Sequence, residues 1–473
     1  MGDIKKTVLD NIDKDKVVET LVDLVSIPSY ADFTLPTYEW DSAKTTYMDN
    51  KAKEIGLESV VAGEISYGRK NLIQFLRGKE RTVKLAIHSH IDTHPPVDYR
   101  LFLKPGNVPR NATAGLVKDG KVWGLGAGDS MPGIAAFLAA AEAIKKSNIQ
   151  LKYDCFGVFD LEEMESGRGA QICVDWLKAN NIKPEFMIVA EPNGYDISIA
   201  QNDLIGFEVV IHGVPGFAPS GSSREEVIGF CNTMERLVEV AQDLQSMVSE
   251  DSRFRFKHHL PTADAPPHYM APLFWLGSSF AGAIHPGIGH PLAPCEPLKP
   301  GQLGRHRANS RTTYGPHIVP ELAKLRFEFC IPPRDIKPDE VFHTEPCISR
   351  QELEELITKR LEKLWIEKPS LGTYEFHCIR QWGNPYEISP EEPHVKLLQE
   401  TVKEGTGREP KLVAATHVCS EGVIFTDEMG VPFANFATPR DKYHRPDEHC
   451  EVSALIDLAR VYALAMLNYC EVA

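Results

Sequence analysis

The sequence predicts an α/β protein, with a mostly parallel sheet flanked by helices and a smaller α+β lid domain inserted into it. Three short apolar runs that end in polar residues predict buried parallel strands, at 85–87, 155–159 and 186–190. Between the first two strands, the glycine-rich stretch 124–133 leads into the alanine-rich helical pattern of 134–144. This strand, helix, strand order is typical of a parallel sheet covered by helices.

The chain length predicts more than one domain, because its 473 residues exceed what a single hydrophobic core usually serves. We place the larger, metal-binding domain at 1–202 and 385–473, and the lid at 203–384. The lid pattern consists of two alternating strands and two amphipathic helices, at 204–213, 325–331, 223–246 and 349–367. A segment rich in proline, glycine and histidine at about 251–320 has no clean period, which predicts a long loop or insertion.

Both ends of the chain contribute to the larger domain. Helical spacing predicts an opening helix over 17–25 that stops before Pro28. The final stretch predicts a helix at 393–405, a strand at 431–436 and a closing helix at 453–470. The sheet is therefore expected to be built from the first and the last parts of the sequence.

Composition excludes several classes of partner. The net charge of -15 disfavours nucleic acid and anionic membrane surfaces. We find neither a secretory signal nor an apolar segment of about 20 residues. Ten cysteines are scattered without a C-x-x-C pair, as expected of free thiols in a reducing compartment. We expect a cytoplasmic protein with neither nucleic acid nor membrane as a partner.

Five potential metal ligands occupy strand ends or turns: His90, Asp129, Glu163, Glu191 and His444. Ligands of open α/β sheets collect beyond the carboxyl ends of the strands, so one crevice is expected to receive these side chains. A divalent cation needs nitrogen and oxygen donors from several chain segments, and this set supplies them. The pattern predicts a metal-dependent hydrolase.

The motifs around these residues match a known family pattern. They are His90-Ile-Asp92-Thr-His-Pro95, Gly124-Leu-Gly126-Ala-Gly-Asp129, Glu162-Glu163, Glu191-Pro192 and His444-Arg-Pro446-Asp447-Glu448. In this order they resemble the zinc aminoacylase, carboxypeptidase G, succinyl-diaminopimelate desuccinylase and bacterial dipeptidase family of co-catalytic metallopeptidases. The resemblance implies a phosphorylase/hydrolase-like zinc exopeptidase fold and covers nearly the whole larger domain and, more loosely, the lid.

The resemblance also implies how the metals are held. Asp129 would bridge two divalent ions, with His90 and Glu191 completing one site and Glu163 and His444 completing the other. Zinc is the expected metal, and manganese or cobalt also accept such donors. A homodimer formed through the lid is a further implication.

Two neighbouring residues are implied in catalysis. Asp92 would orient His90 and fix its tautomer. Glu162 would be the general base, taking a proton from a water acidified by the metals and delivering it to the leaving amine. The expected substrate is a small molecule, and the expected reaction is hydrolysis of a C–N amide bond in an N-acyl amino acid or dipeptide.

The chain departs from the family pattern at two places. Met131 and Pro132 stand where relatives carry a lysine two residues after the bridging aspartate and then a small residue. Phe217 stands where the lid normally presents a histidine to the substrate carbonyl. Candidate replacements for this oxyanion donor are the histidines and arginines of the insertion, namely His258, His259, His268, His285, His290, His306, His317, Arg305, Arg307 and Arg311.

Further substrate contacts are expected from Phe217, Arg334, Ser420 and Glu421. Arg334 lies near the position of a lid arginine in the family, and Ser420-Glu421-Gly422 resembles its [ST]-D-[GA] loop. Because of the departures, two other functions stay open. One is a specialised aminohydrolase or deaminase acting on a non-peptide substrate, and the other is a binding protein that retains metal without turnover.

Overall fold

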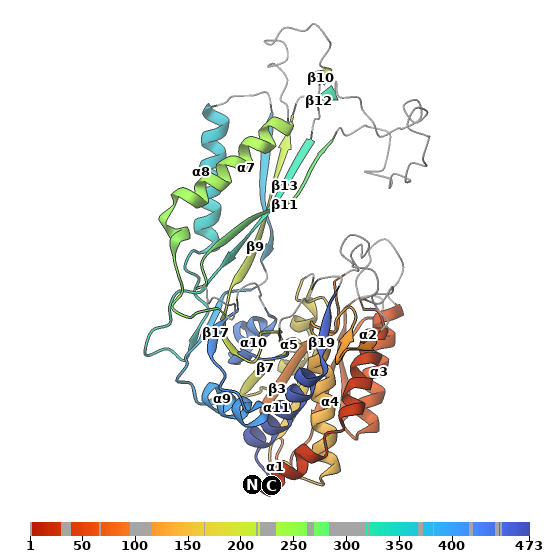
Figure 1. The fold of residues 1–473 in the computed structure, drawn as a ribbon. Coiled ribbons are helices and arrows are strands. Elements are labelled where there is room, and N and C mark those ends of the chain that lie inside the picture. The colour runs from red at the N-terminus through yellow and green to blue at the C-terminus, as the bar shows by residue number, and fades with distance from the viewer. Residues whose placement is uncertain are drawn as a thin grey trace, which may run out of the picture.

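The computed structural model describes residues 2–29, 39–65, 68–94, 115–164, 166–213, 216–217, 233–262, 269–282, 318–319, 322–367, 372–381, 383–415, 420–439, 444 and 447–473. Several predicted features lie outside the described residues: Pro95, Pro446, and His268, His285, His290, His306, His317, Arg305, Arg307 and Arg311 of the insertion. Figure 1 shows a larger body, which we call the core domain, and a smaller one, the lid.

A ten-stranded sheet forms the centre of the core domain, in the order β1-β2-β6-β3-β7-β18-β8-β16-β14, with β17 also paired to β8. The strands are β1 (Glu58–Glu64), β2 (Lys70–Leu76), β3 (Val83–His90), β6 (Asp154–Asp160), β7 (Phe186–Val189), β8 (Ile197–Gln201), β14 (Phe342–His343), β16 (Tyr386–Ile388), β17 (Leu412–Ala414) and β18 (Phe433–Asn435). The adjacent strands β6, β3, β7 and β18 run parallel, as expected for the three apolar runs. The outer pairs are antiparallel, apart from β17 with β8.

Helices cover both faces of this sheet (Figure 1). One layer contains α1 (Gly2–Asp10), α2 (Lys14–Ser26), α3 (Glu39–Glu54), α4 (Met131–Lys146), α9 (Pro393–Thr406) and α11 (Val452–Cys470). The other contains α5 (Arg168–Ala179) and α10 (Gly422–Met429). Side-chain caps fix the starts of two of these helices. The Asp13 side chain accepts from Lys16 N at the start of α2, and Glu392 accepts from two amides at the start of α9. The expected opening, central and closing helices are thus confirmed.

Helix α11 is the closing helix expected from the sequence. Among the described residues it is the one helix long and apolar enough to cross a membrane, with a mean hydropathy of 1.2 over its most apolar window. However, 72% of that window is buried within the fold. Because α11 packs against α2, α4 and α9, its apolar composition is explained by its place in the core.

The lid has its own four-stranded antiparallel sheet, in the order β11-β13-β9-β15. Its strands are β9 (Asp203–His212), β11 (Leu273–Gly282), β13 (Leu322–Ile331) and β15 (Thr373–Gln381), and its helices are α7 (Thr233–Glu250), α8 (Arg350–Glu367) and the short η2 (Ser252–Arg255). A second hydrophobic core, containing Phe207, Phe327 and Phe329, lies between this sheet and the two long helices. Two small sheets complete the described structure, β10 (Gly216–Phe217) with β12 (Ile318–Val319), and β4 (Leu116–Lys118) with β5 (Lys121–Trp123) and β19 (His449–Glu451).

Strand β11 corrects the expectation that 251–320 is a loop or insertion without regular structure. It is a ten-residue edge strand that pairs with β13. The pairing register shifts between Leu276 and Ser279. Such a bulge interrupts the period of two by which a strand is recognised in a sequence, which explains why this strand was missed. In addition, the described part of α7 begins at Thr233, ten residues after the expected start at Ser223, and residues 218–232 are outside the described part.

Candidate metal centre

The predicted ligands come together at the carboxyl ends of neighbouring parallel strands. His90 is the last residue of β3, Glu163 follows β6, and Glu191 follows β7. Since β3 lies between β6 and β7 and runs parallel to both, all three strands end at the same edge of the sheet. This edge is where open α/β sheets bind ligands.

Asp129 carries a different histidine on each of its carboxylate oxygens. His90 Nε2 lies 3.0 Å from Asp129 Oδ1, and His444 Nε2 lies 2.9 Å from Oδ2. His90 is fully buried, whereas the His444 side chain is 38% exposed and forms the solvent side of the site. This is the arrangement expected of a carboxylate that bridges two ions, each also bound by one imidazole.

The remaining carboxylates complete two donor groups. Donor atoms of His90, Asp129 and Glu191 lie within 4.8 Å of one another, and so do those of Glu163, Glu191 and Glu421. Glu163 Oε2 is buried and has no hydrogen-bond partner. A buried carboxylate oxygen without a donor is costly, and a cation would remove this cost. The described residues therefore fit a divalent metal centre with nitrogen and oxygen ligands.

Charge and burial shift the pKa values of these groups strongly. Burial raises the pKa of Glu163, and the nearby carboxylates of Glu191 and Asp129 add to the shift while His90 opposes it. For His90, burial lowers the pKa, but the carboxylates of Asp129 and Glu163 outweigh burial and raise it. Burial would raise the pKa of Asp129, and the two histidines instead hold it below its usual range. So dense a set of perturbed groups is typical of a functional site.

Glu448 holds the glycine-rich turn that carries Asp129. Its Oε1 accepts hydrogen bonds from the amides of Gly126, Gly128 and Asp129, at 3.1, 2.9 and 3.1 Å. Gly126 has a φ of 86°, which favours glycine. Burial raises the pKa of Glu448 to about 8. Glu448 was noted only as part of a motif, and the structure assigns it this positioning role.

Asp92 orients His90 differently from the expectation. His90 Nδ1 lies 2.8 Å from the backbone oxygen of Asp92, while the nearer carboxylate oxygen lies 3.9 Å away. The carboxylate instead accepts from the amides of Glu163 and Met164. The carbonyl of Asp92 therefore fixes the Nδ1–H tautomer that leaves Nε2 to bind a metal, and its carboxylate positions the loop of Glu163.

The predicted base, Glu162, is held in a buried ion pair. Its Oε1 lies 2.9 Å from Arg69 Nη1, and its Oε2 accepts from the hydroxyl of Ser166 at 2.8 Å. The Arg69 side chain is 3% exposed and that of Glu162 is 12% exposed. Arg69 was missed because no sequence motif connects it with a residue 93 positions away.

Met131 has a cationic neighbour from another helix. It is fully buried as the first residue of α4. Lys44 of α3, 1% exposed, places its Nζ 3.6 Å from Met131 Sδ and 2.7 Å from Ser29 Oγ. A lysine side chain from another helix therefore lies beside the position where the family pattern has lysine.

Two of the four residues predicted to contact substrate, Ser420 and Glu421, are buried in the core domain. Ser420 is fully buried, with its hydroxyl 2.7 Å from Gln201 Oε1, and its contact with substrate stays a prediction. Glu421 is also fully buried and belongs to the metal-side carboxylates rather than to an open substrate surface. Burial raises its pKa, and neighbouring carboxylates, Asp160 first among them, add to the shift.

The two lid candidates do not join the metal centre. Arg334 pairs with Glu340 at 2.5 Å and with Glu345, so its charge is already matched. Hydrogen bonds with these carboxylates raise the pKa of Arg334. The backbone of Phe217 pairs with Ile318 in the small sheet β10-β12, away from the strand ends of the core domain (Figure 1).

Of the insertion histidines, His258 and His259 are described. Their Nε2 atoms lie 3.0 and 3.1 Å from the carboxylate oxygens of Glu387, on β16 of the core-domain sheet. His343 shares the same carboxylate at 3.3 Å. Because both histidines contact Glu387 at the junction of the two domains, neither acts as the oxyanion donor in this arrangement.

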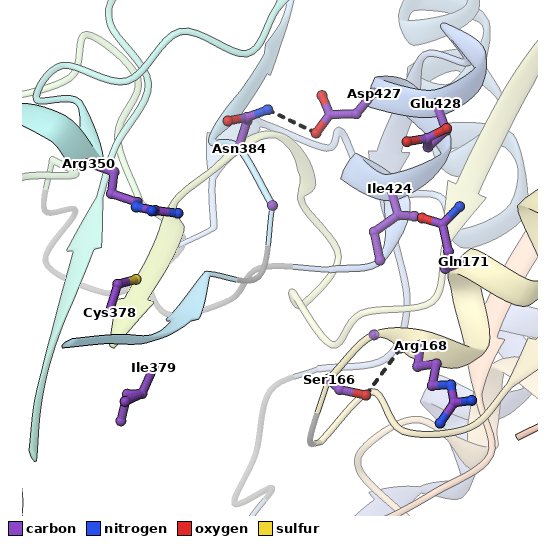
Figure 2. Close-up of a pocket in the computed structure, with 12 residues that line it drawn as sticks. Ser166, Arg168, Gln171, Arg350, Cys378, Ile379, Asn384, Ile424, Asp427 and Glu428 are labelled. Atoms are coloured by element: carbon purple, nitrogen blue, oxygen red, sulfur yellow. Dashed lines mark hydrogen bonds between the residues drawn. The ribbon is translucent and has the colours of Figure 1, made fainter. Parts of the chain in front are cut away.

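A cavity of about 790 Å³ opens between the core domain and the lid (Figure 2). It is lined by Ser166, Arg168 and Gln171 before and within α5, Arg350 at the start of α8, Cys378 and Ile379 of β15, and Asn384 and Asp427, which share a hydrogen bond of 3.0 Å. Because Ser166 also donates to Glu162, one wall of the cavity is in direct contact with the predicted base.

Comparisons with known proteins agree with this geometry. The model of peptidase family M20/M25/M40 matches residues 86–468. A succinyl-diaminopimelate desuccinylase of Wolbachia pipientis is 25% identical over 182 residues, which cover 37% of this chain and 44% of the relative. The chain thus matches less than half the length of that relative.

Two solved structures share the fold over almost their whole length. Human carnosine dipeptidase 1 has a TM-score of 0.69 at 12% identity, covering 99% of each chain. A tripeptidase from Staphylococcus aureus has a TM-score of 0.63 at 17% identity, covering 97% of this chain and 99% of the other. The family expected from the motifs is therefore confirmed, together with the α/β fold and its lid. This chain belongs to peptidase family M20/M25/M40.

Proposed function

We propose that this protein is a metal-dependent hydrolase that cleaves the C–N amide bond of a small molecule, such as an N-acyl amino acid or a dipeptide. The observation that carries the proposal is Asp129, which holds His90 on one oxygen and His444 on the other, next to buried carboxylates that lack donors. The names of the similar proteins, a desuccinylase, a dipeptidase and a tripeptidase, support a small acylated or peptide substrate.

The roles of the chain's own residues follow from their contacts. Two divalent ions, held by His90, Asp129, Glu163, Glu191 and His444, would polarise the amide carbonyl and acidify a water. Glu162 takes the proton of that water on a carboxylate oxygen and passes it to the leaving amine. Arg69 and Ser166 hold Glu162 in one orientation, so little reorganisation is needed at the moment of transfer.

The cavity between the domains is the proposed entry for the rest of the substrate. Arg168, Gln171 and Asn384 offer polar groups on its walls, and Ile379 and Ile424 offer apolar surface. In ligand pockets, a small number of well-placed polar groups fix the orientation of a small ligand. A substrate lying there would present its scissile bond toward Glu162, beside Ser166.

Three finer features are also proposed. Zinc is the proposed metal, because mixed imidazole and carboxylate donors suit it. A homodimer through the lid is supported by Met234 and Val238 of α7, which are 44% and 48% exposed. A cytoplasmic location is supported by the cysteines, of which the seven described are free thiols. Metal analysis, light scattering and cell fractionation test these features one by one.

The proposed activity is tested on a substrate panel. Protein loaded with Zn²⁺, Mn²⁺ or Co²⁺ is incubated with dipeptides and N-acyl amino acids, including N-succinyl compounds, and released amine is measured. We expect turnover on one class, and a loss of about 10²–10⁴-fold in Glu162→Gln with metal content unchanged. Glu185→Gln, at an exposed residue paired with Lys84, is the matched control.

Different results would favour the other functions. Ammonia release from a non-peptide amine with no activity on the panel would support the aminohydrolase alternative. Full metal occupancy without turnover on any substrate would support a binding protein. Unchanged turnover in Glu162→Gln would remove this residue as the base. Because Glu162 also neutralises Arg69, unfolding is measured in parallel, so that a loss of fold is not mistaken for a loss of base.

A further inference from the structure

A second group of buried donors lies directly beneath the metal centre. His88 is on β3, two residues before His90, Asp160 is the last residue of β6, and Glu421 precedes α10. All three are 0% exposed. One ring nitrogen of His88 and one carboxylate oxygen from each of the other two lie within 4.8 Å of one another. Glu421 is also near Glu163 and Glu191, but none of the three residues is among the ligands assigned to the proposed two-ion site.

The hydrogen bonds of this group leave several donor atoms unused. His88 Nε2 lies 2.9 Å from Asp160 Oδ2, a contact like that between His90 Nε2 and Asp129 Oδ1, so a cation held by both residues would take the lone pair of Nε2. His88 Nδ1, Asp160 Oδ1 and both carboxylate oxygens of Glu421 are buried without a hydrogen-bond partner. A buried polar group without a partner is costly. One ring nitrogen of His88 and carboxylate oxygens of Asp160 and Glu421 thus surround one enclosed point.

Charge balance points the same way, a step that rests on the proposed function. The region contains seven buried carboxylates, those of Asp92, Asp129, Asp160, Glu163, Glu191, Glu421 and Glu448. Two divalent ions would offset four negative charges, and Arg69 is already paired with Glu162. Buried charges are tolerated when they are paired or bind a metal. The carboxylates of Asp160 and Glu421 are among those that these two ions would leave unmatched.

We propose that His88, Asp160 and Glu421 form a third divalent cation site, separate from the two ions that share Asp129. Its donors, one imidazole and two carboxylates, are those that zinc and manganese accept. The ion would connect β3, β6 and the start of α10 under the catalytic ions. It would also let Glu421 remain ionised although it is buried. A bridging water is the alternative occupant that the experiment must separate.

The test counts ions and locates them. Purified protein is stripped with chelator, reloaded with excess Zn²⁺ or Mn²⁺, and desalted, and metal per chain is measured by plasma mass spectrometry. Crystals of the same samples give anomalous difference maps at the metal edge. The variant is His88→Phe, which keeps a ring beside Phe425. The control is His394→Phe, at a histidine stacked on Phe186 and Tyr469 and outside the donor groups.

We expect three ions per chain in the wild type and in His394→Phe, and two in His88→Phe, with the lost peak lying between His88, Asp160 and Glu421. Two ions beside Asp129 in both the wild type and His88→Phe would overturn the third site and leave the proposed function intact. Wild-type protein without ions at Asp129 would overturn the proposed function. If His88→Phe does not fold, the wild-type map decides alone, by the presence or absence of the third peak.

Discussion

Replacing Arg69 by methionine isolates the buried ion pair that holds Glu162. The substitution keeps an apolar chain in place of the arginine stem but removes the only described cation paired with Glu162. With the guanidinium 3% exposed and the carboxylate 12% exposed, neither group can be fully rehydrated when its partner is lost. Breaking a buried pair typically costs about 3–5 kcal/mol. The partial exposure of Glu162 and its hydrogen bond to Ser166 place the expected loss at the lower end, about 3 kcal/mol.

The assay is urea unfolding followed by intrinsic fluorescence and circular dichroism. Lys53→Met is the matched control, because Lys53 forms an i,i+4 pair with Asp49 on α3 and is 61% exposed. Such a surface pair is worth less than about 1 kcal/mol. If Arg69→Met were no more destabilising than Lys53→Met, the ion pair would not hold Glu162, and the positioning argument would fail. In the double variant Arg69→Met/Glu162→Gln, the loss of unfolding free energy should be smaller than the sum of the losses in the two single variants.

Three further predictions concern the framework of the site. Glu448→Ala removes the acceptor of three amide hydrogen bonds and should lower the free energy of unfolding by about 3 kcal/mol. It should also weaken metal binding, measured by titration calorimetry, about 10–100-fold. Glu448→Gln should retain both the stability and the metal affinity. Gly133→Ala places a Cβ 2.4 Å from that of Ala190 and should cost about 1–3 kcal/mol in urea unfolding; no loss would mean that α4 can move away from β7. Burial would raise the pKa of Glu387, but hydrogen bonds from His258 and His343 lower it below its usual value. The contribution of Glu387 to stability should therefore be present above the unfolded pKa of 4.5 and be lost as pH falls through the lower folded pKa. Glu387→Gln should remove that part of the acid dependence of unfolding, and an unchanged pH profile would contradict it.

The metal ligands could be predicted from the sequence because each belongs to a local sequence pattern. His90, Glu163 and Glu191 lie at or just after the ends of apolar runs, and parallel strands bring such ends to one edge of a sheet. Asp129 lies in a glycine-rich turn before a strong helix. These features depend on neighbours in the sequence, so periodicity and turn chemistry were sufficient to place them.

The supporting contacts could not be predicted in the same way, because they join distant segments. Glu448 binds amides more than 300 positions away, and Arg69 reaches Glu162 across 93 positions. Asp92 was expected to use its carboxylate, and only the local backbone path shows that its carbonyl is nearer to His90. A bulge obscured the alternating pattern of strand β11, and the sequence did not indicate that Arg334 pairs with Glu340 and Glu345. Such choices are decided by tertiary packing.

Anomalous diffraction from metal-loaded crystals tests most directly whether Asp129 bridges two catalytic ions. We expect two peaks flanking the Asp129 carboxylate, one also beside His90 and Glu191 and the other beside Glu163 and His444. A map without density at Asp129 under metal-replete conditions, or with ions bound only elsewhere, would contradict it.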